Sequence, residues 1–167
     1  MKITTTRFSA LEVDEASLIL MQRGILGFER YKRFVLLKPS SDEPLLWLQA
    51  VDDPALAFVV ANPSVIKRNY NPAIMEYELE LLDIQRGEDI VLLSILTFHV
   101  PPLGVTANLR APIVINTANR KGNQVVLEDP AYPIQYPVLG DDAGGEGGRE
   151  ETRRRRLDKL SMAISAA

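Results

Sequence analysis

The chain contains no cysteine, which excludes disulfide bonds, thiolate zinc sites and cysteine nucleophiles. It has one histidine, His99, and it lacks the motifs GxSxG and HExxH and a Gly-rich phosphate loop. Its formal net charge is -3, so it also lacks the basic excess of a nucleic-acid binder. The sequence therefore offers no familiar motif for hydrolysis, metal binding or nucleotide binding.

Hydrophobic runs long enough to cross a membrane are also missing. The longest apolar run, residues 90–100, is interrupted by polar residues and falls short of the ~20 residues that span a bilayer. The opening segment MKITTTRFSALEVDE has no apolar core of the kind found in signal peptides. We therefore expect a cytoplasmic protein that is neither secreted nor inserted in a membrane, and the absence of cysteine is compatible with this location.

What the chain does have is a strong signal for β-structure. A length of 167 residues with 46% apolar and 25% charged residues suits one globular domain with a sizeable core. Turn residues such as Asn62-Pro63 and Lys121-Gly122 separate short β-rich segments. The segments that are apolar on both faces are 33–38, 45–51, 56–61 and 90–100. This spacing predicts an all-β fold: a small antiparallel β-barrel-like domain with short helices.

Residues 75–81 alternate with a period of two. Apolar side chains take turns with Glu76, Glu78 and Glu80. This pattern predicts a half-buried strand with three carboxylates on its solvent face, although the same window can carry a short helix from Glu78 onward.

A second alternating segment covers residues 107–116. Asn108, Arg110 and Asn116 lie mostly on the face opposite to the leucine and isoleucine side chains. Pro112 cannot donate a ladder hydrogen bond, so the pattern indicates a strand that is at an edge or bulged at this point.

The composition changes near Leu139. Residues 140–148, GDDAGGEGG, are typical of a flexible linker. Apolar residues at helical spacing follow the run Arg153–Arg156 and favour a short helix. We therefore expect a domain at 1–139 and a flexible or helical Arg-rich tail at 140–167. The arginine run is interpreted as a solvated arm, with RNA or acidic-lipid binding as the alternative.

Few single residues invite a catalytic interpretation. Asp52 and Asp53 precede Pro54, and this sequence favours a tight turn whose side chains cap backbone amides over a paired-carboxylate site. His99 has no evident nucleophile or orienting partner, so we expect a structural or surface role, with a small hydrolase or isomerase as the alternative. The aromatic residues expected in the core are Phe34, Trp47 and Phe58.

Three segments occur in a distinctive order. They are GILGFERYKRFVLL (24–37), WLQAVDDPALAFVVANP (47–63), and TANLRAPIVIN (106–116) followed by NRKGNQVVL (119–127). Together with the opening MKITTTRFSALEVDE, they resemble the conserved blocks of the flagellar assembly factors, the FliW family. The resemblance covers residues 1–137, and it departs from the family pattern at Leu26, where a proline is common.

The resemblance implies a small cytoplasmic β-barrel-like binding protein without catalysis, cofactor or metal. Its implied partners are flagellin, held in a chaperone-like manner, and the RNA-binding carbon storage regulator CsrA. Binding of CsrA would relieve its translational repression of flagellin. Neither direct nucleic-acid binding nor membrane binding is implied.

We expect the partner-binding residues to be exposed residues of these blocks. The residues selected on this ground are Asp52, Asp53, Asn108, Arg110 and Asn116. The glutamates at 76, 78 and 80 are added on charge alone, as an acidic patch for a basic partner. No catalytic, cofactor-binding or metal-binding residue is expected.

Overall fold

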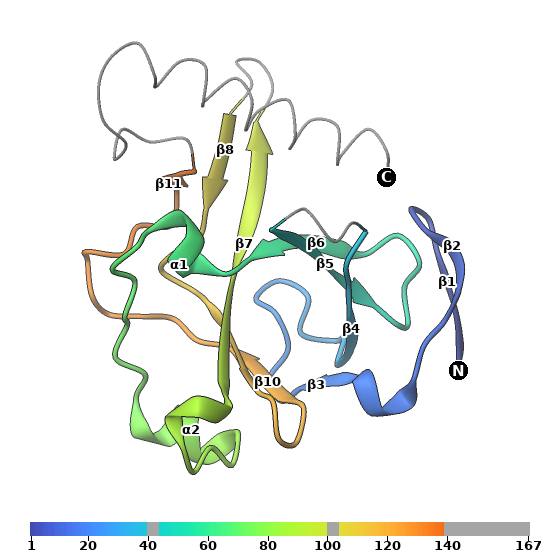
Figure 1. The fold of residues 1–167 in the computed structure, drawn as a ribbon, viewed down its shortest axis with the longest axis horizontal. Helices are drawn as coiled ribbons and strands as arrows, with labels where there is room; N and C mark the ends of the chain where they lie inside the picture. The colour runs from blue at the N-terminus through green and yellow to red at the C-terminus, as the bar shows by residue number, and fades with distance from the viewer. Residues whose placement is uncertain (40–43, 100–103, 139–167) are drawn as a thin grey trace.

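The computed structural model describes residues 1–39, 44–99 and 104–138 (Figure 1). The predicted linker and tail at 140–167 lie outside the described residues. The strands are β1 (Lys2–Thr5), β2 (Ser9–Glu12), β3 (Ile19–Met21), β4 (Arg33–Leu37), β5 (Leu45–Ala50), β6 (Ala57–Ala61), β7 (Ile90–His99), β8 (Gly104–Ala107), β9 (Ile113–Asn116), β10 (Lys121–Gln124) and β11 (Tyr136–Pro137). The helices are η1 (Glu15–Ser17), α1 (Pro63–Ile66), α2 (Glu76–Leu81) and η2 (Gly87–Asp89).

The strands β3, β4, β5, β6, β7, β9 and β10 form a closed ring. Each is hydrogen-bonded to the next, and the pairing of β7 with β9 closes the barrel. The second half of the long strand β7 leaves the ring and pairs with β8, which β11 extends. The prediction of a mostly β, barrel-like fold is confirmed. It differs in one pairing, because β3 and β10 run parallel while the other ring pairs are antiparallel.

Strand β4 shows why some segments are apolar on both faces. Phe34 and Leu36 belong to the cluster inside the barrel, and Phe34 is completely buried. Val35 and Leu37 point outward and are covered by the β1–β2 hairpin, which lies against this side of the barrel (Figure 1). The strand therefore has apolar contacts on both sides. Trp47 is buried as expected, whereas Phe58 is only half-buried.

A second apolar cluster lies outside the ring, against β7 and β9. Its aromatic members Tyr70 and Tyr132 meet edge to face with their ring centroids 4.8 Å apart. The Tyr70 hydroxyl donates to the carbonyl of Leu109 at 2.9 Å, and burial raises the pKa of Tyr70. Tyr70 belongs to the segment after β6 and Tyr132 to the segment after β10. The cluster therefore holds both segments, which lie outside the ring, against the barrel. No helix in the described part of the chain is long and apolar enough to cross a membrane.

Residues 76–81 form a helix, so the predicted strand is wrong; the alternative of a short helix is correct in type, but the helix begins two residues before the expected Glu78. Helix α2 begins at Glu76 and ends at Leu81. Glu78 and Leu82 lie four residues apart on one helical face, and both are buried. Glu76 and Glu80 remain exposed. The predicted solvent-facing row of three carboxylates therefore does not exist, because the helix turns the middle one into the protein.

The predicted strand over 107–116 is shorter in the structure. Strand β9 begins at Ile113, directly after Pro112. The residues before it form a turn that the side chain of Asn108 stabilises, since its Oδ1 accepts hydrogen bonds from the backbone N–H groups of Arg110 and Ala111 at 3.1 and 3.0 Å. Proline thus marks the start of the strand and not a bulge within it.

Candidate functional site

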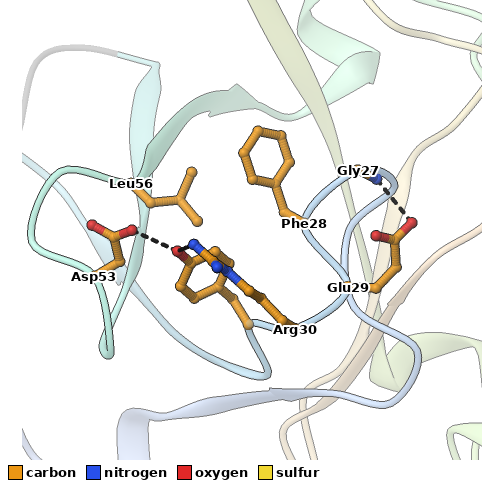
Figure 2. A pocket seen from close by; sticks show the side chains of 7 residues that line it. Gly27, Phe28, Glu29, Arg30, Asp53 and Leu56 are labelled. Carbon is orange, nitrogen blue, oxygen red and sulfur yellow. Dashed lines mark hydrogen bonds between the residues drawn. The ribbon is translucent and has the colours of Figure 1, made fainter.

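A hollow of about 460 Å³ lies between the segment after β3 and the turn that joins β5 to β6 (Figure 2). It is lined by Gly27, Phe28, Glu29, Arg30, Tyr31, Asp53 and Leu56. In Figure 2, Asp53 and Glu29 lie at opposite ends, with Leu56, Phe28 and Arg30 between them. The hollow therefore forms where the block at 24–37 meets the block at 47–63, and strands β4 and β5 separate its two walls in the sequence.

Glycines shape the first wall of the hollow. Gly24 and Gly27 have φ angles of +88° and +83°, a backbone region that favours glycine. At Gly24 the backbone of Glu29 comes so close that an added Cβ would lie 2.7 Å from its Cα. The turn is closed by the hydrogen bond from the N–H of Phe28 to the carbonyl of Ile25 at 2.7 Å. The two glycines thus fold residues 24–29 back on themselves and direct Phe28 toward the hollow.

Strand β10 holds this wall in place. The Oε1 atom of Gln124 accepts a hydrogen bond from the N–H of Leu26 at 2.9 Å, while its amide donates to the carbonyl of Ala111 at 3.1 Å. The neighbouring Asn123 accepts from the N–H of Arg23 at 3.4 Å. The third sequence block, 106–116 with 119–127, therefore positions the first block from behind.

The second wall is the turn at 52–56. Asp53 accepts hydrogen bonds from the N–H of Ala55 at 3.0 Å and from the Tyr31 hydroxyl at 2.7 Å. The predicted capping turn is thus confirmed for Asp53. Beneath it, the buried amide of Gln49 donates to the carbonyls of Ala50, Asp53 and Leu56 at 2.9, 3.0 and 3.0 Å. Sequence reasoning missed Gln49, although a lone amide inside an apolar strand was a usable signal.

Asp52 and Asp53 do not act as a pair. The carboxylate of Asp52 contacts the guanidinium of Arg33 on β4, with Nε at 3.2 Å from Oδ2. This hydrogen bond lowers the pKa of Asp52 and raises that of Arg33. The carboxylates have separate partners, as expected for adjacent residues of an extended turn. Of the two, only Asp53 lines the hollow.

Both carboxylates of the hollow are held in the ionised form. The hydrogen bond from Tyr31, followed by that from the Ala55 N–H, lowers the pKa of Asp53. The hydrogen bond from the Gly27 N–H, 2.9 Å from Oε1, lowers the pKa of Glu29. Between them, the Arg30 guanidinium lies over the Tyr31 ring, 4.6 Å from its centroid. The hollow thus carries two negative charges and one positive charge.

The apolar part of the hollow is aromatic. Phe28 is 38% exposed, and its ring meets the ring of Phe58 edge to face with centroids 5.2 Å apart. Leu56 faces it from the other wall (Figure 2). An open concavity with an exposed phenylalanine and a few directed polar groups is suited to binding a side chain of another molecule. Sequence reasoning selected neither Phe28 nor its neighbours as site residues, although they belong to the GFE block.

The remaining predicted partner-binding residues lie elsewhere. Asn116 is 2% exposed and donates to the carbonyls of Leu82 and Asp83 at 2.9 and 3.2 Å, so its predicted exposure is wrong. The Nε of Arg110 donates to the carbonyl of Tyr132 at 2.7 Å. Asn116 thus joins strand β9 to the loop after α2, Arg110 joins two loops, and Asn108 stabilises its own turn. Their polar groups are needed because loop carbonyls and amides next to the core must be paired.

Glu78 is also not exposed as predicted. It is 3% exposed, and its Oε2 accepts hydrogen bonds from the Arg23 guanidinium at 2.5 Å and from the Asn123 amide at 2.9 Å. The ion pair ties α2 to the segment that leads into the hollow. Sequence reasoning could not have found it, since Arg23 and Glu78 are 55 positions apart.

His99 lies outside the hollow, at the end of β7 that pairs with β8. Its Nε2 is 2.9 Å from the hydroxyl of Thr106. The catalytic alternative called for a carboxylate beside this ring, and the contact found is a hydroxyl on the neighbouring strand. Within the described residues, no three His, Cys, Asp or Glu side chains gather in a way that could hold a metal ion.

Comparisons with known proteins agree with this architecture. A family model described as "FliW protein" matches residues 2–138. Flagellar assembly factor FliW of Syntrophus aciditrophicus (strain SB) is 49% identical over 139 residues, which cover 83% of this chain and 88% of that protein. The protein of the same name from Bacillus subtilis (strain 168) is 39% identical over 141 residues, covering 84% and 99%. A crystal structure of the flagellar assembly factor FliW superposes with a TM-score of 0.77 at 36% identity, covering 86% of this chain and 100% of the solved one. The chain belongs to the FliW family of flagellar assembly factors.

Proposed function

We propose that this protein works in the cytoplasm as a non-catalytic binding protein with two partners, flagellin and the carbon storage regulator CsrA. Bound to CsrA, it antagonises the translational repression of flagellin. The observation that carries the proposal is the hollow lined by residues between 27 and 56, an exposed concavity built from two of the blocks that carry the family resemblance.

The chemistry of the hollow supports binding more than catalysis. Its lining residues are glycine, phenylalanine, glutamate, arginine, tyrosine, aspartate and leucine. Its carboxylates have lowered pKa values, whereas a general acid or base working near neutral pH needs a carboxyl with a raised one. Phe28 offers the kind of exposed aromatic surface that dominates binding energy at protein interfaces.

Titration calorimetry of the full chain with purified flagellin, and separately with CsrA, tests the proposal. Saturable binding of both proteins is the expected result. A competition titration then shows whether flagellin displaces CsrA. If neither protein binds, the proposed function is wrong. A gel shift with RNA that depends on residues 149–167 would favour the alternative of an RNA-binding module.

Phe28→Ala should weaken binding of at least one partner by about tenfold or more, because an exposed aromatic residue in a concave site is a typical hot spot. The matched control is Val65→Ala on α1, since Val65 is 64% exposed and lies outside the hollow. Calorimetry gives the affinities, and thermal unfolding shows that both variants are folded. If the two variants bind both partners with equal affinity, the hollow takes no part in binding.

The two glutamates that remain exposed on α2 give a separate prediction. The double variant Glu76→Lys, Glu80→Lys should slow association with a basic partner such as CsrA about threefold at low salt and flatten its salt dependence, because rim charges act mainly on association rates. Stopped-flow mixing at several salt concentrations measures both effects. Glu78 is left unchanged because it is buried. Unaltered kinetics would show that this surface of α2 takes no part.

A further inference from the structure

The positive charge in the hollow belongs to a side chain that the fold does not hold firmly. Arg30 is exposed, and its guanidinium contacts its own neighbour Tyr31 and is attracted by the charge of Asp53. We propose that the hollow is a receptor for an arginine side chain of a protein partner, and that Arg30 fills this place in the unbound protein. This inference rests on the proposed function of the hollow as a binding site, and it specifies the chemistry of what binds there.

The site has the parts that recognise a guanidinium group. The Tyr31 ring offers a face on which a planar cation stacks, as Arg30 does at 4.6 Å. The Tyr31 hydroxyl accepts a hydrogen bond from the guanidinium and donates one to the Asp53 carboxylate at 2.7 Å. The chain from guanidinium to phenol to carboxylate polarises each bond in the direction that favours a cation.

The remaining walls suit the aliphatic part of an arginine side chain. Phe28 and Leu56 face the space between the two carboxylates (Figure 2). An arginine buries its methylene stem on such a surface while its charged end stays at polar groups. A purely apolar side chain would leave Asp53 and the Tyr31 hydroxyl beside hydrocarbon, which is costly. Lysine fits less well, because it lacks the planar group that stacks on tyrosine.

The charge of Asp53 can be balanced by an incoming cation in place of Arg30. The Arg30 side chain extends toward Asp53, whose pKa its charge helps to lower, and away from Glu29 at the other end of the hollow (Figure 2). An incoming guanidinium can take the place over Tyr31 while Arg30 turns out into solvent, where its charge is fully hydrated. Exchange of one stacked arginine for another costs little, because an exposed cation–π contact is weak. Arg30 therefore competes with the ligand and lowers its affinity.

An NMR titration of the ¹⁵N-labelled full chain tests the proposal with three small probes: N-acetyl-arginine amide, N-acetyl-lysine amide and N-acetyl-leucine amide. The arginine probe should give saturable shifts at the amides of Gly27 and Ala55, whose N–H groups are bonded to the carboxylates of Glu29 and Asp53. The lysine probe should bind more weakly, and the leucine probe should leave these signals unchanged. A leucine probe that binds as well as the arginine probe, or an arginine probe that causes no saturable shift, overturns the proposal.

Two variants test the roles of Arg30 and Asp53 separately. Arg30→Ala should tighten binding of the arginine probe about threefold, because it removes the competing cation. Asp53→Asn should abolish that binding, and the Ala55 amide signal shows whether the turn is retained. Unchanged or weaker binding by Arg30→Ala would refute the role of Arg30. The probes do not involve flagellin or CsrA, so the chemistry of the hollow and the identity of its partners can fail independently.

Discussion

Glu78→Lys should lower the free energy of unfolding by about 3–5 kcal/mol, because it places an unpaired cation at a buried position beside the Arg23 guanidinium. In the native protein, Oε2 of Glu78 accepts hydrogen bonds from Arg23 at 2.5 Å and from Asn123 at 2.9 Å. A lysine at this position can only donate hydrogen bonds, so the Arg23 guanidinium and the Asn123 amide would both lose their acceptor. Arg23 can turn to solvent, since its side chain is 55% exposed, but the buried Asn123 amide cannot.

The matched control is Glu80→Lys, the same change two residues along the same helix. Glu80 is exposed, and a surface substitution of this kind changes stability by about 0.5 kcal/mol or less. Glu78→Gln gives the intermediate case, an expected loss of about 1–3 kcal/mol, because the shape is kept while the charge-assisted bond is lost. Urea unfolding followed by the fluorescence of Trp47 measures all three. Equal midpoints for Glu78→Lys and Glu80→Lys would contradict the buried role of Glu78.

Helix α2 shows where sequence reasoning stops. The window 75–81 is short enough that period two and helical spacing select overlapping sets of residues. What distinguishes them is the partner of Glu78, and Arg23 lies too far away in the sequence to enter a local pattern. For the strands β4, β5, β6 and β7 the opposite holds. Their apolar residues cover both faces, and this local property alone predicts an interior strand.

The candidate site was only partly predictable for a related reason. The turn at Asp53 follows from local chemistry, because an aspartate before proline tends to cap the amides that follow it. The hollow itself requires Tyr31 and Asp53 to meet across two strands, which depends on strand order. Asn116 was misassigned because a polar side chain was taken to be exposed. In the structure it satisfies loop carbonyls next to the core, which is the usual reason for a buried amide.

Three sequence blocks that are separate along the chain serve one site in the structure. The first block supplies one wall of the hollow, and the second supplies the opposite wall. The third supplies Gln124, which holds the first wall at Leu26 from outside the hollow. A substitution in any block should therefore act on the same surface. We expect the largest effect from a substitution in the backbone turn of the first wall, residues 24–29.

Gly24→Ala should destabilise the protein by about 3 kcal/mol, because a side chain at φ +88° is strained and its Cβ would lie 2.7 Å from the Cα of Glu29. Backbone atoms form this contact, so it cannot be relieved by rotation of a side chain. We expect residues 24–29 to open, the hydrogen bond from Phe28 to Ile25 to be lost, and partner affinity to fall with it.

Gly27→Ala separates the cost of the positive φ angle from the cost of the close contact with Glu29. Gly27 has a similar φ of +83°, but an added Cβ would meet nothing within 4 Å. Its cost should be the backbone strain alone, about 1–2 kcal/mol. Urea unfolding gives the difference between the two variants, and hydrogen exchange at the Phe28 amide reports opening of the turn. If both variants lose the same stability, the close approach of Glu29 to Gly24 has no energetic weight, and strain alone explains the glycines of this block.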